Sequence, residues 1–379
     1  MKKHLLIFVL IFSFSHFHNF TFAQGLRISL LTCTPGQALS ETFGHSALRV
    51  VDSTTATDVV YNYGTFPFYE PGFYLKFIQG KLKYSVEIEP FNEFINYYQQ
   101  TNRGITEQVL QLTPTEKTTI YHALTENIKP QNKYYQYDFF LDNCTTRLRD
   151  IIEKYKTPKP SLPAVMPTNY TFRQAIHQYL QRNQQPWSQL GIDLLLGAKT
   201  DAVMTKEQQM FLPDNLMHAI DSVKSTKLVA GSIKLFTPTL NPYTTNIFIP
   251  IFFFSAFFLL CLGLSISKNI FCNTLLKWLD IGLFTLVGLL GVLLVLMWVA
   301  TNHSMTKDNY NLLWASPLFL AYPFVIRKPT AIAKKVSLIA FVYLVLVLCS
   351  WAFLPQLMNS AFLPIVILMS WRSIAALQH

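Results

Sequence analysis

The stretch Asp142-Asn143-Cys144-Thr145 places a thiol where a helix is expected to begin. Asp142 or Asn143 can cap that helix. Its apolar positions recur at helical spacing and share one stripe: Cys144, Leu148, Ile151 and Tyr155. Free backbone N–H groups and the helix dipole favour a thiolate at a first turn. The pattern predicts a nucleophilic cysteine facing the protein body; small core filler is the other common use of such a cysteine.

A base for this thiol is found on a predicted hairpin. Residues 43–51 and 58–64 are strand-like and flank a polar turn. With the turn centred between residues 54 and 55, His45 faces Gly64, and Ala47 faces Asn62. Opposed residues share a face, so the Asn62 amide is expected within reach of the His45 imidazole. A one-residue slip or a bulge would present Tyr61 or Tyr63 instead.

Composition indicates a composite molecule. The 379 residues are 51% hydrophobic and only 14% charged, too apolar for one soluble domain. Residues 1–23 have the basic start, short apolar run and small residues of a secretory signal peptide, although an uncleaved anchor is an alternative. We predict four parts: a signal peptide at 1–23, a catalytic domain at 24–160, a helical extension and linker at 161–242, and a transmembrane domain at 243–379.

Five hydrophobic segments of this last part are predicted to cross a membrane: 243–266, 278–300, 311–326, 336–354 and 361–374. If the front domain is exported, alternate loops and the C-terminal tail face the cytoplasm. These are the basic ones, and they carry Lys268, Lys277, Arg327, Lys328, Lys334, Lys335 and Arg372. The charge asymmetry therefore agrees with export and puts His303 and Asn309 on the outer side. Their loop is either a substrate-contacting lip or an ordinary polar connection.

The remaining features bear on which ligands are expected. Residues 66–98 are crowded with aromatic side chains, which serve either as core or as an apolar mouth for acyl chains. The net charge of +10 comes from scattered basic residues, with no basic stripe for nucleic acid. No metal-ligand spacing and no glycine-rich phosphate loop occur, so neither a metal nor another cofactor is expected.

Several of these motifs together resemble the Lnb-type membrane proteins: Gly44-His45-Ser46, Tyr61-Asn62-Tyr63-Gly64, Asp142-Asn143-Cys144-Thr145, Leu31-Thr32-Cys33, Phe211-Leu212-Pro213, and Thr301-Asn302-His303 with Asn309 to Trp314. The resemblance implies an α+β fold. Its exported part would be a permuted papain-like, NlpC/P60-like thiol-enzyme domain, in which an antiparallel sheet packs on a cysteine-bearing helix and the histidine strand precedes that helix. An all-α membrane domain of about five transmembrane helices would follow.

The resemblance also implies an activity, N-acylation of lipoproteins at the outer face of an inner membrane. In that scheme His45 deprotonates Cys144, Asn62 orients His45, and an acyl group passes from a lipid through a thioester to the α-amine of a lipoprotein. The implied partners are a lipoprotein N-terminus and an acyl donor that is a phospholipid or a lipoprotein. The residues considered as substrate contacts are Tyr61, Tyr63, Asn143, His303 and Asn309.

Two alternatives remain open on sequence grounds. The same dyad would serve an exported, membrane-anchored thiol hydrolase such as a cell-wall peptidase or amidase. A non-enzymatic membrane scaffold is the other, with Cys33 and Cys144 joined in a disulfide. An anchor of five spans exceeds what a hydrolase of soluble substrates needs, and this favours the acyltransferase.

Overall fold

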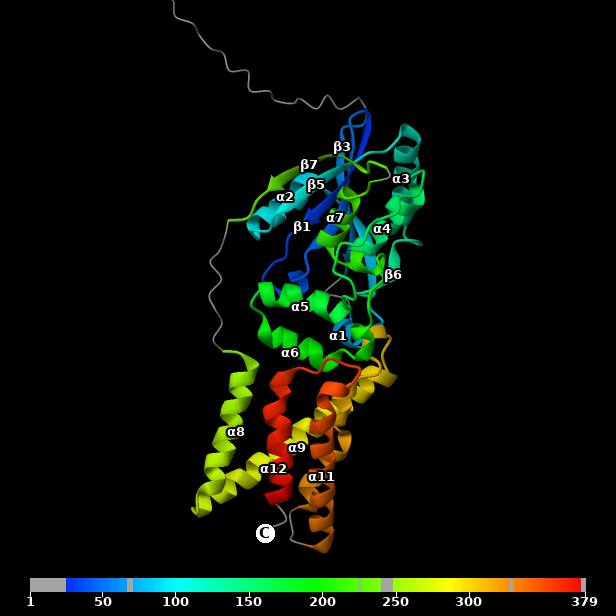
Figure 1. Cartoon of the computed structure of the whole chain (residues 1–379). Coiled ribbons are helices and arrows are strands. Elements are labelled where there is room, and N and C mark those ends of the chain that lie inside the picture. The colour runs from blue at the N-terminus through cyan, green and yellow to red at the C-terminus, as the bar shows by residue number, and fades with distance from the viewer. Residues whose placement is uncertain (1–24, 67–70, 225, 240–247, 327–329, 376–379) are drawn as a thin grey trace, which may run out of the picture.

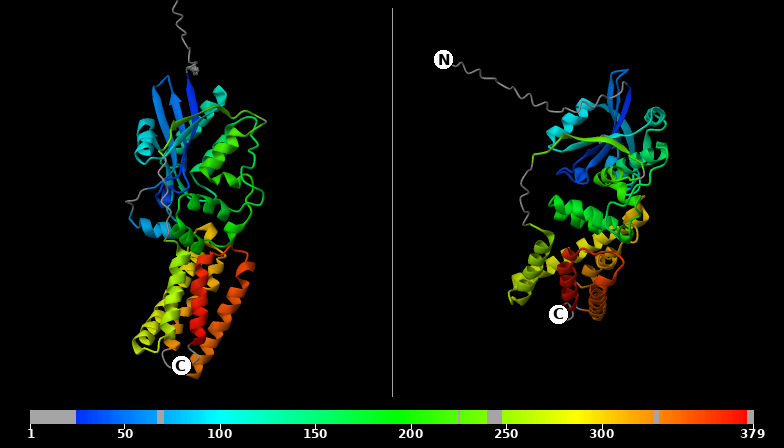
Figure 2. Two further views of the ribbon diagram at one scale, coloured as in Figure 1. Left: turned by 60° about the vertical axis from the view of Figure 1, so that its left-hand side comes forward. Right: turned by 45° about the horizontal axis from the view of Figure 1, so that its top comes forward.

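The computed structural model describes residues 25–66, 71–224, 226–239, 248–326 and 330–375. The predicted signal peptide lies outside these ranges, as do the first residues of the first predicted span. Within them, a sheet with its covering helices stands at one end of an elongated molecule, and a group of long helices stands at the other (Figures 1 and 2).

The sheet has seven antiparallel strands in the order β6-β4-β3-β2-β1-β5-β7. Their bounds are β1 Leu26–Cys33, β2 His45–Asp52, β3 Thr57–Thr65, β4 Lys83–Pro90, β5 Ile105–Leu110, β6 Tyr134–Gln136 and β7 Val229–Phe236. In the β2–β3 hairpin, Leu48 pairs with Tyr61 and Asp52 with Thr57, so the predicted register is confirmed. The predicted α+β class is likewise confirmed.

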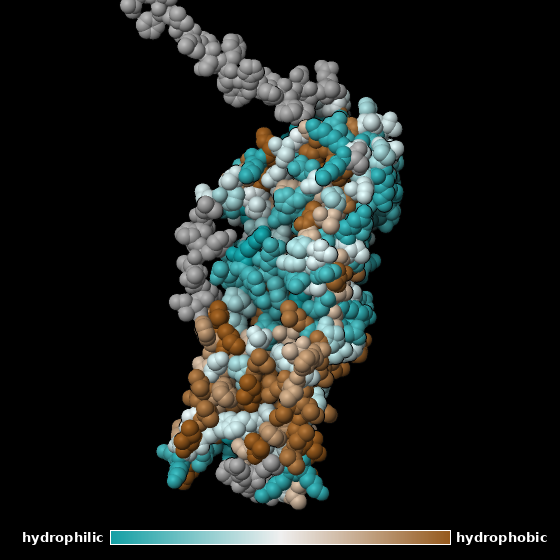
Figure 3. Space-filling view, in the orientation of Figure 1, coloured by the Kyte–Doolittle hydropathy of each residue, from teal (hydrophilic) through white to brown (hydrophobic). Residues whose placement is uncertain are grey.

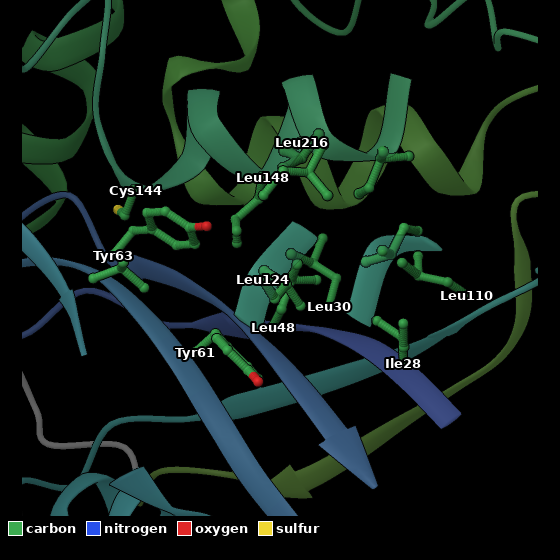
Figure 4. Packing of buried hydrophobic residues seen from close by; sticks show 14 of the residues in the cluster. Ile28, Leu30, Leu48, Tyr61, Tyr63, Leu110, Leu124, Cys144, Leu148 and Leu216 are labelled. Atoms are coloured by element: carbon green, nitrogen blue, oxygen red, sulfur yellow. The ribbon is translucent and has the colours of Figure 1, made fainter. Parts of the chain in front are cut away.

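The sheet is accompanied by helices, some of which cover its two faces. They are α1 Phe73–Ile78, α2 Phe91–Gln100, α3 Pro114–Asn127, α4 Cys144–Tyr155, α5 Phe172–Arg182, α6 Pro186–Leu195 and α7 Pro213–Asp221. One face carries α3, α4 and α7 over a core that includes Leu30, Leu48 and Leu148 (Figure 4). On the opposite face, Phe94 and Tyr98 of α2 pack against Leu31 and Ala47. The strands that hold the site are therefore buried on both sides.

The segment 161–242 does more than the predicted helical linker. Its helix α7 packs on β1, and β7 then joins the sheet beside β5. Leu216 and Val229 belong to the same core as β1 and β2. The sheet domain therefore includes residues beyond position 160, because its edge strand β7 follows helices α5 to α7 in the sequence.

The second half consists of apolar helices: α8 Pro250–Ile266, α9 Ile270–Val299, α10 Tyr322–Val325, α11 Ala331–Ser350 and α12 Leu363–Ala375. By length and composition, α9 and α11 (with the turn that follows it) suffice to cross a membrane, whereas α8 and α12 are shorter apolar helices. Their surfaces form a hydrophobic zone at one end of the molecule (Figure 3). Basic Lys334 lies in the first turn of α11.

Residues 311–326 differ from the single span that we predicted. They belong to three short helices, Tyr310–Leu313, Pro317–Leu320 and α10, and the second of these packs against α9. Pro317 and Pro323 each lie in the first turn of a helix. Proline has no N–H to continue a preceding helix, which explains why the segment is interrupted.

The two halves meet through a docking seam, which we define as Arg173, Asp193, Asn309, Asn311, Gln356 and Asn359. Asp193 of α6 is buried and accepts hydrogen bonds from Arg173 (2.8 Å) and Asn359 (2.8 Å). Asn311 donates to the Asp193 carbonyl at 2.9 Å. The seam therefore holds α5 and α6 against the outer ends of the apolar helices (Figure 1).

Candidate active site

The thiol lies at the first residue of α4, as predicted. Asn143 caps this helix: its side-chain oxygen accepts the N–H groups of Thr145 (2.8 Å) and Thr146 (2.9 Å). Cys144 is only 8% exposed and points with Leu148 from α4 towards the strands, with Tyr63 beside it (Figure 4). The cap therefore fixes both the helix start and the direction of the sulfur.

His45 reaches the thiol from the first residue of β2. It stands opposite Cys33 of β1, and Gly44 precedes it with φ +76°. A Cβ at Gly44 would lie 2.6 Å from the Cys33 carbonyl oxygen, so only glycine fits this close turn into the strand. The imidazole is hydrogen-bonded to Cys144 and to Asn62. Residues about a hundred positions apart thus meet.

The hydrogen bonds define the tautomer of His45. The Asn62 amide nitrogen donates to a carboxylate oxygen of Glu89 at 2.8 Å, and a carboxylate can only accept. The amide oxygen therefore faces His45 and accepts from Nε2–H at 2.6 Å. With the proton on Nε2, Nδ1 is the nitrogen that can take a proton from the thiol. The predicted contact between His45 and Asn62 is confirmed, and Glu89 extends it.

The charges of this pair favour ionisation of the thiol. Burial raises the pKa of Cys144, but the charge and hydrogen bond of His45 and the backbone N–H of Ser46 outweigh it and lower the pKa from 9.0 to about 7. Burial by itself lowers the pKa of His45. The interactions with Cys144 and Asn62 raise it by more than burial lowers it, so the net shift is upwards. Thiolate and imidazolium stabilise each other near neutral pH.

Two hydrogen-bond donors near the thiol have no partner among the described residues. The Asn143 side chain accepts from the N–H groups of Thr145 and Thr146, and the Cys144 N–H has no partner among the described residues. The Tyr135 hydroxyl is buried and unpaired. It lies 3.9 Å from where a Cβ on Gly64 would stand, and the Cys144 Cβ lies 3.7 Å from that same point. Burial, with the nearby thiolate, raises the pKa of Tyr135, so its hydroxyl keeps its proton.

Most of the residues predicted to contact substrate have structural roles instead. Asn143 is buried, and its amide nitrogen donates to the carbonyls of Phe139 and Phe211, both at 2.8 Å. Tyr61 and Tyr63 are core residues, and the Tyr63 hydroxyl accepts from Asn127 at 2.8 Å. The capping role of Asn143 was one of the two predicted for this helix start, whereas a core tyrosine is recognised only by what surrounds it.

The outer loop contributes one predicted contact but not the other. Asn309 is buried in the docking seam, where its amide donates to the carbonyls of Leu194 (2.8 Å) and Leu195 (3.1 Å), so it holds the loop against α6. His303 is half-buried and donates to the Phe77 carbonyl at 3.1 Å. It lines a cavity of about 360 Å³ between the two halves of the molecule.

The cysteines are all free thiols, so the Cys33–Cys144 disulfide of the scaffold alternative is absent. Cys33 lies in β1 directly opposite His45 and hydrogen-bonds with Tyr98, and burial raises its pKa to about 12. Cys144, in contrast, lies on helix α4 and interacts with the His45 side chain. Within the described ranges, no three His, Cys, Asp or Glu side chains come together in a group fit to hold a metal ion.

Three groups at the site were not predicted: Glu89, Tyr135 and the Ser46 N–H. Glu89 lies on β4, next to the hairpin, where Glu87 and Glu89 alternate with apolar Val86 and Ile88. That alternation was the available signal for a strand with polar side chains on the face of Asn62. Nothing in the sequence marks the Tyr135 hydroxyl, since its lack of a partner is a property of the folded chain.

The fold and site define a membrane protein whose α+β domain carries a buried thiol–imidazole pair. The family model of the Lnb N-terminal periplasmic domain matches residues 13–178, and that of the Lnb transmembrane domain matches residues 243–379. These matches span most of the chain in the order that the structure has. The chain therefore belongs to the Lnb family, with a periplasmic domain followed by a transmembrane domain. No curated protein and no solved structure matches it.

Proposed function

We propose that this protein is a membrane-bound lipoprotein N-acyltransferase that works through a thioester on Cys144. The observation that carries the proposal is the contact of Cys144 with His45, which Asn62 and Glu89 orient at the start of α4. A permuted papain-like arrangement, with the histidine strand before the cysteine helix, accounts for this order of residues. Membership of the Lnb family supports the same conclusion.

The first half-reaction transfers the acyl group to the enzyme. Nδ1 of His45 takes the thiol proton, and the Cys144 thiolate attacks an ester carbonyl of a lipid. The N–H of Cys144 and the hydroxyl of Tyr135 are the free donors available to the oxyanion. When the carbon–oxygen bond breaks, the His45 imidazolium returns its proton to the departing alkoxide. The products are a lyso-lipid and an acyl thioester.

The second half-reaction transfers the acyl group to the acceptor. The α-amine of a lipoprotein's N-terminal cysteine attacks the thioester carbonyl, and the carbon–sulfur bond breaks to regenerate the thiolate. The amine proton passes to His45 and the amide is released. The overall change moves one acyl group from an ester to an amine, so no redox partner and no metal is required.

The proposed setting is the inner membrane, with the sheet domain on the periplasmic side and the C-terminus in the cytoplasm. The basic loops and the hydrophobic zone of the long helices support this orientation (Figure 3). Both substrates would then be held by their own lipid in the outer leaflet. A buried thiol close to the bilayer suits them better than it suits a soluble wall fragment.

The experiment uses the full-length protein in liposomes with a diacylated lipoprotein peptide. Mass spectrometry is expected to find the N-acylated peptide, a lyso-lipid, and a hydroxylamine-sensitive acyl adduct on Cys144. The variant Cys144→Ala should lose at least about 10⁴-fold in activity because the nucleophile is gone. The matched control Cys349→Ala, at an exposed cysteine of α11, should keep full activity.

Full activity in Cys144→Ala would exclude this function. An unmodified peptide amine together with free fatty acid or cleaved wall fragments would instead assign the same dyad to a hydrolase, in which water takes the place of the amine.

A further inference from the structure

The cavity between the two halves is apolar. Its walls come from α1, the segment 136–140, α5, α6 and the loop 302–306. Phe139, Ile176 and Ile192 are among the side chains that line it. The one carboxylate in its lining is Asp138, which already accepts hydrogen bonds from the Phe140 N–H (2.9 Å) and from Ser304 (2.5 Å). The cavity therefore offers a ligand hydrocarbon contacts and little unmet charge.

One end of the cavity lies towards Gly64, which neighbours the thiol. Tyr137 lines the cavity, and its ring lies 3.7 Å from the point where a Cβ on Gly64 would stand. The Cys144 Cβ lies at the same distance, 3.7 Å, from that point. Phe43, another lining residue, precedes the Gly44 turn that presents His45. A chain lying in the cavity would thus end beside the sulfur.

The other end lies beside an unusually apolar surface helix. In α1, Tyr74 is 78% exposed, and Leu75, Phe77 and Ile78 are about half exposed or more. Figure 1 shows α1 next to the upper ends of the apolar helices. Exposed aromatic and aliphatic side chains at this level suit the boundary between lipid and water better than water itself. Phe77 belongs both to this surface and to the cavity lining.

The loop from the membrane half closes the remaining wall and is held in place. Its Asn302 N–H donates to the Gln79 carbonyl at 2.9 Å, and His303 donates to the Phe77 carbonyl. Gly80 has φ +65°, and a Cβ there would lie 3.1 Å from the His303 backbone nitrogen. Glycine at this position lets the loop approach α1 closely. The cavity is therefore built jointly by the sheet domain and the membrane domain.

We propose that this cavity holds the hydrocarbon chain of the acyl donor, with the carbonyl end of the chain towards Cys144 and its far end beside α1. This inference rests on the proposed function and adds the location of the chain. The cavity volume of about 360 Å³ lies within the roughly 300–1,000 Å³ typical of small-molecule sites. The occupant is a lipid chain, because the walls are apolar and include Phe77 of the exposed apolar helix α1.

The test uses full-length Cys144→Ala protein, which cannot turn over, in liposomes containing a phospholipid with a photoreactive diazirine on its acyl chain. After irradiation, mass spectrometry is expected to find adducts on lining residues such as Phe139 and Met305. The variant Ile192→Trp fills the cavity and should reduce these adducts at least about fivefold. The control Ile233→Trp, at an exposed isoleucine of β7, should leave them unchanged.

A second variant, Leu196→Trp, fills the same space from another position, so that misfolding of one variant does not decide the outcome. Adducts confined to α8, α9 and α11, or adducts unaffected by both tryptophans, would overturn the proposal. Labelling of the lining by a photoreactive lipoprotein peptide instead of the lipid chain would overturn it as well.

The two proposals fail in different ways. Labelled lining residues without any thioester on Cys144 of the wild-type protein would leave the lipid site standing and remove the acyltransferase. A thioester that forms while the lining stays unlabelled would do the reverse.

Discussion

The start of α4 and the docking seam both bury polar groups, but they use them differently. In the seam, Asp193 accepts from Arg173, His177 and Asn359, and the Arg173 guanidinium also bonds Asp201. At the start of α4, the Cys144 N–H has no partner within the described part of the chain, and neither does the nearby Tyr135 hydroxyl of β6. Saturated groups hold elements together, whereas unsatisfied donors beside a thiolate are available to a reacting molecule.

The largest effect is expected where the thiol depends on its base. His45→Ala should reduce transfer by roughly 10²–10⁴-fold, because proton transfer is lost. It should also raise the pKa of Cys144 above about 7, because the charge and hydrogen bond of His45 are the largest effects that oppose burial. Alkylation rates measured against pH should rise through about pH 7 in the wild type, since the thiolate forms above its pKa.

In the variant, this rise should occur only at higher pH. His122→Ala, at an exposed histidine of α3, is the matched control and should behave as the wild type. If His45→Ala kept the midpoint near pH 7, the two residues would not form the pair described.

A substitution in the docking seam should lower the stability of the protein instead of its activity. Arg173→Met leaves the Asp193 carboxylate buried without its cation, and removing one partner of a buried pair costs about 3–5 kcal/mol. Denaturant titration followed by the fluorescence of Trp187, on α6, measures this loss. Arg182→Met, on the exposed side of the same helix α5, is the control and should change little. Equal stabilities for the two variants would show that the buried Arg173–Asp193 pair does not stabilise the seam.

A smaller effect is expected for the orphan hydroxyl. Tyr135→Phe should lower turnover by about 10²–10³-fold, the usual cost of losing one oxyanion donor, and leave the alkylation profile of Cys144 in place. Tyr134→Phe, at the exposed neighbouring tyrosine, should have no effect. Wild-type turnover in Tyr135→Phe would return that residue to a packing role.

The smallest effect should come from Glu89, which acts only through Asn62. Loss of one hydrogen bond of about 0.5–1.5 kcal/mol corresponds to about a 2- to 10-fold fall in turnover for Glu89→Ala. Glu87→Ala, two residues earlier on β4, removes an exposed carboxylate that binds Lys133 at 2.8 Å and should not affect turnover. A loss for Glu89→Ala as large as that for His45→Ala would mean that Glu89 touches the reacting atoms.

The sequence predicted those parts of the site that depend on local rules. The Asn143 cap follows from residue type, and the meeting of His45 with Asn62 follows from the hairpin register. The rest depended on long-range placement. Glu89 lies on β4, a strand within the aromatic-rich segment 66–98 that we did not predict as a strand. Asn309 faces α6 because the loop after α9 packs against the sheet domain.

The fold divides in the same way. The α+β class and the boundary before the apolar helices were readable from composition and periodicity. The return of β7 to the sheet was not, since a strand that pairs across more than a hundred residues carries no local mark of its partner. The prolines that interrupt residues 311–326 were visible, but their effect was outweighed by the hydrophobicity of that segment.

The hydrogen bond between Ser304 and Asp138 links the membrane helices to the segment that precedes Cys144. Ser304 follows the outer end of α9, and the Asp138 backbone pairs with that of Asp142, two residues before Cys144. A few contacts therefore tie the sulfur to the membrane helices, so it stands at a fixed height above the bilayer. Under the proposed function, this fixed distance selects the substrates. Only a carbonyl or an amine that reaches Cys144 while its lipid stays anchored in the bilayer can react.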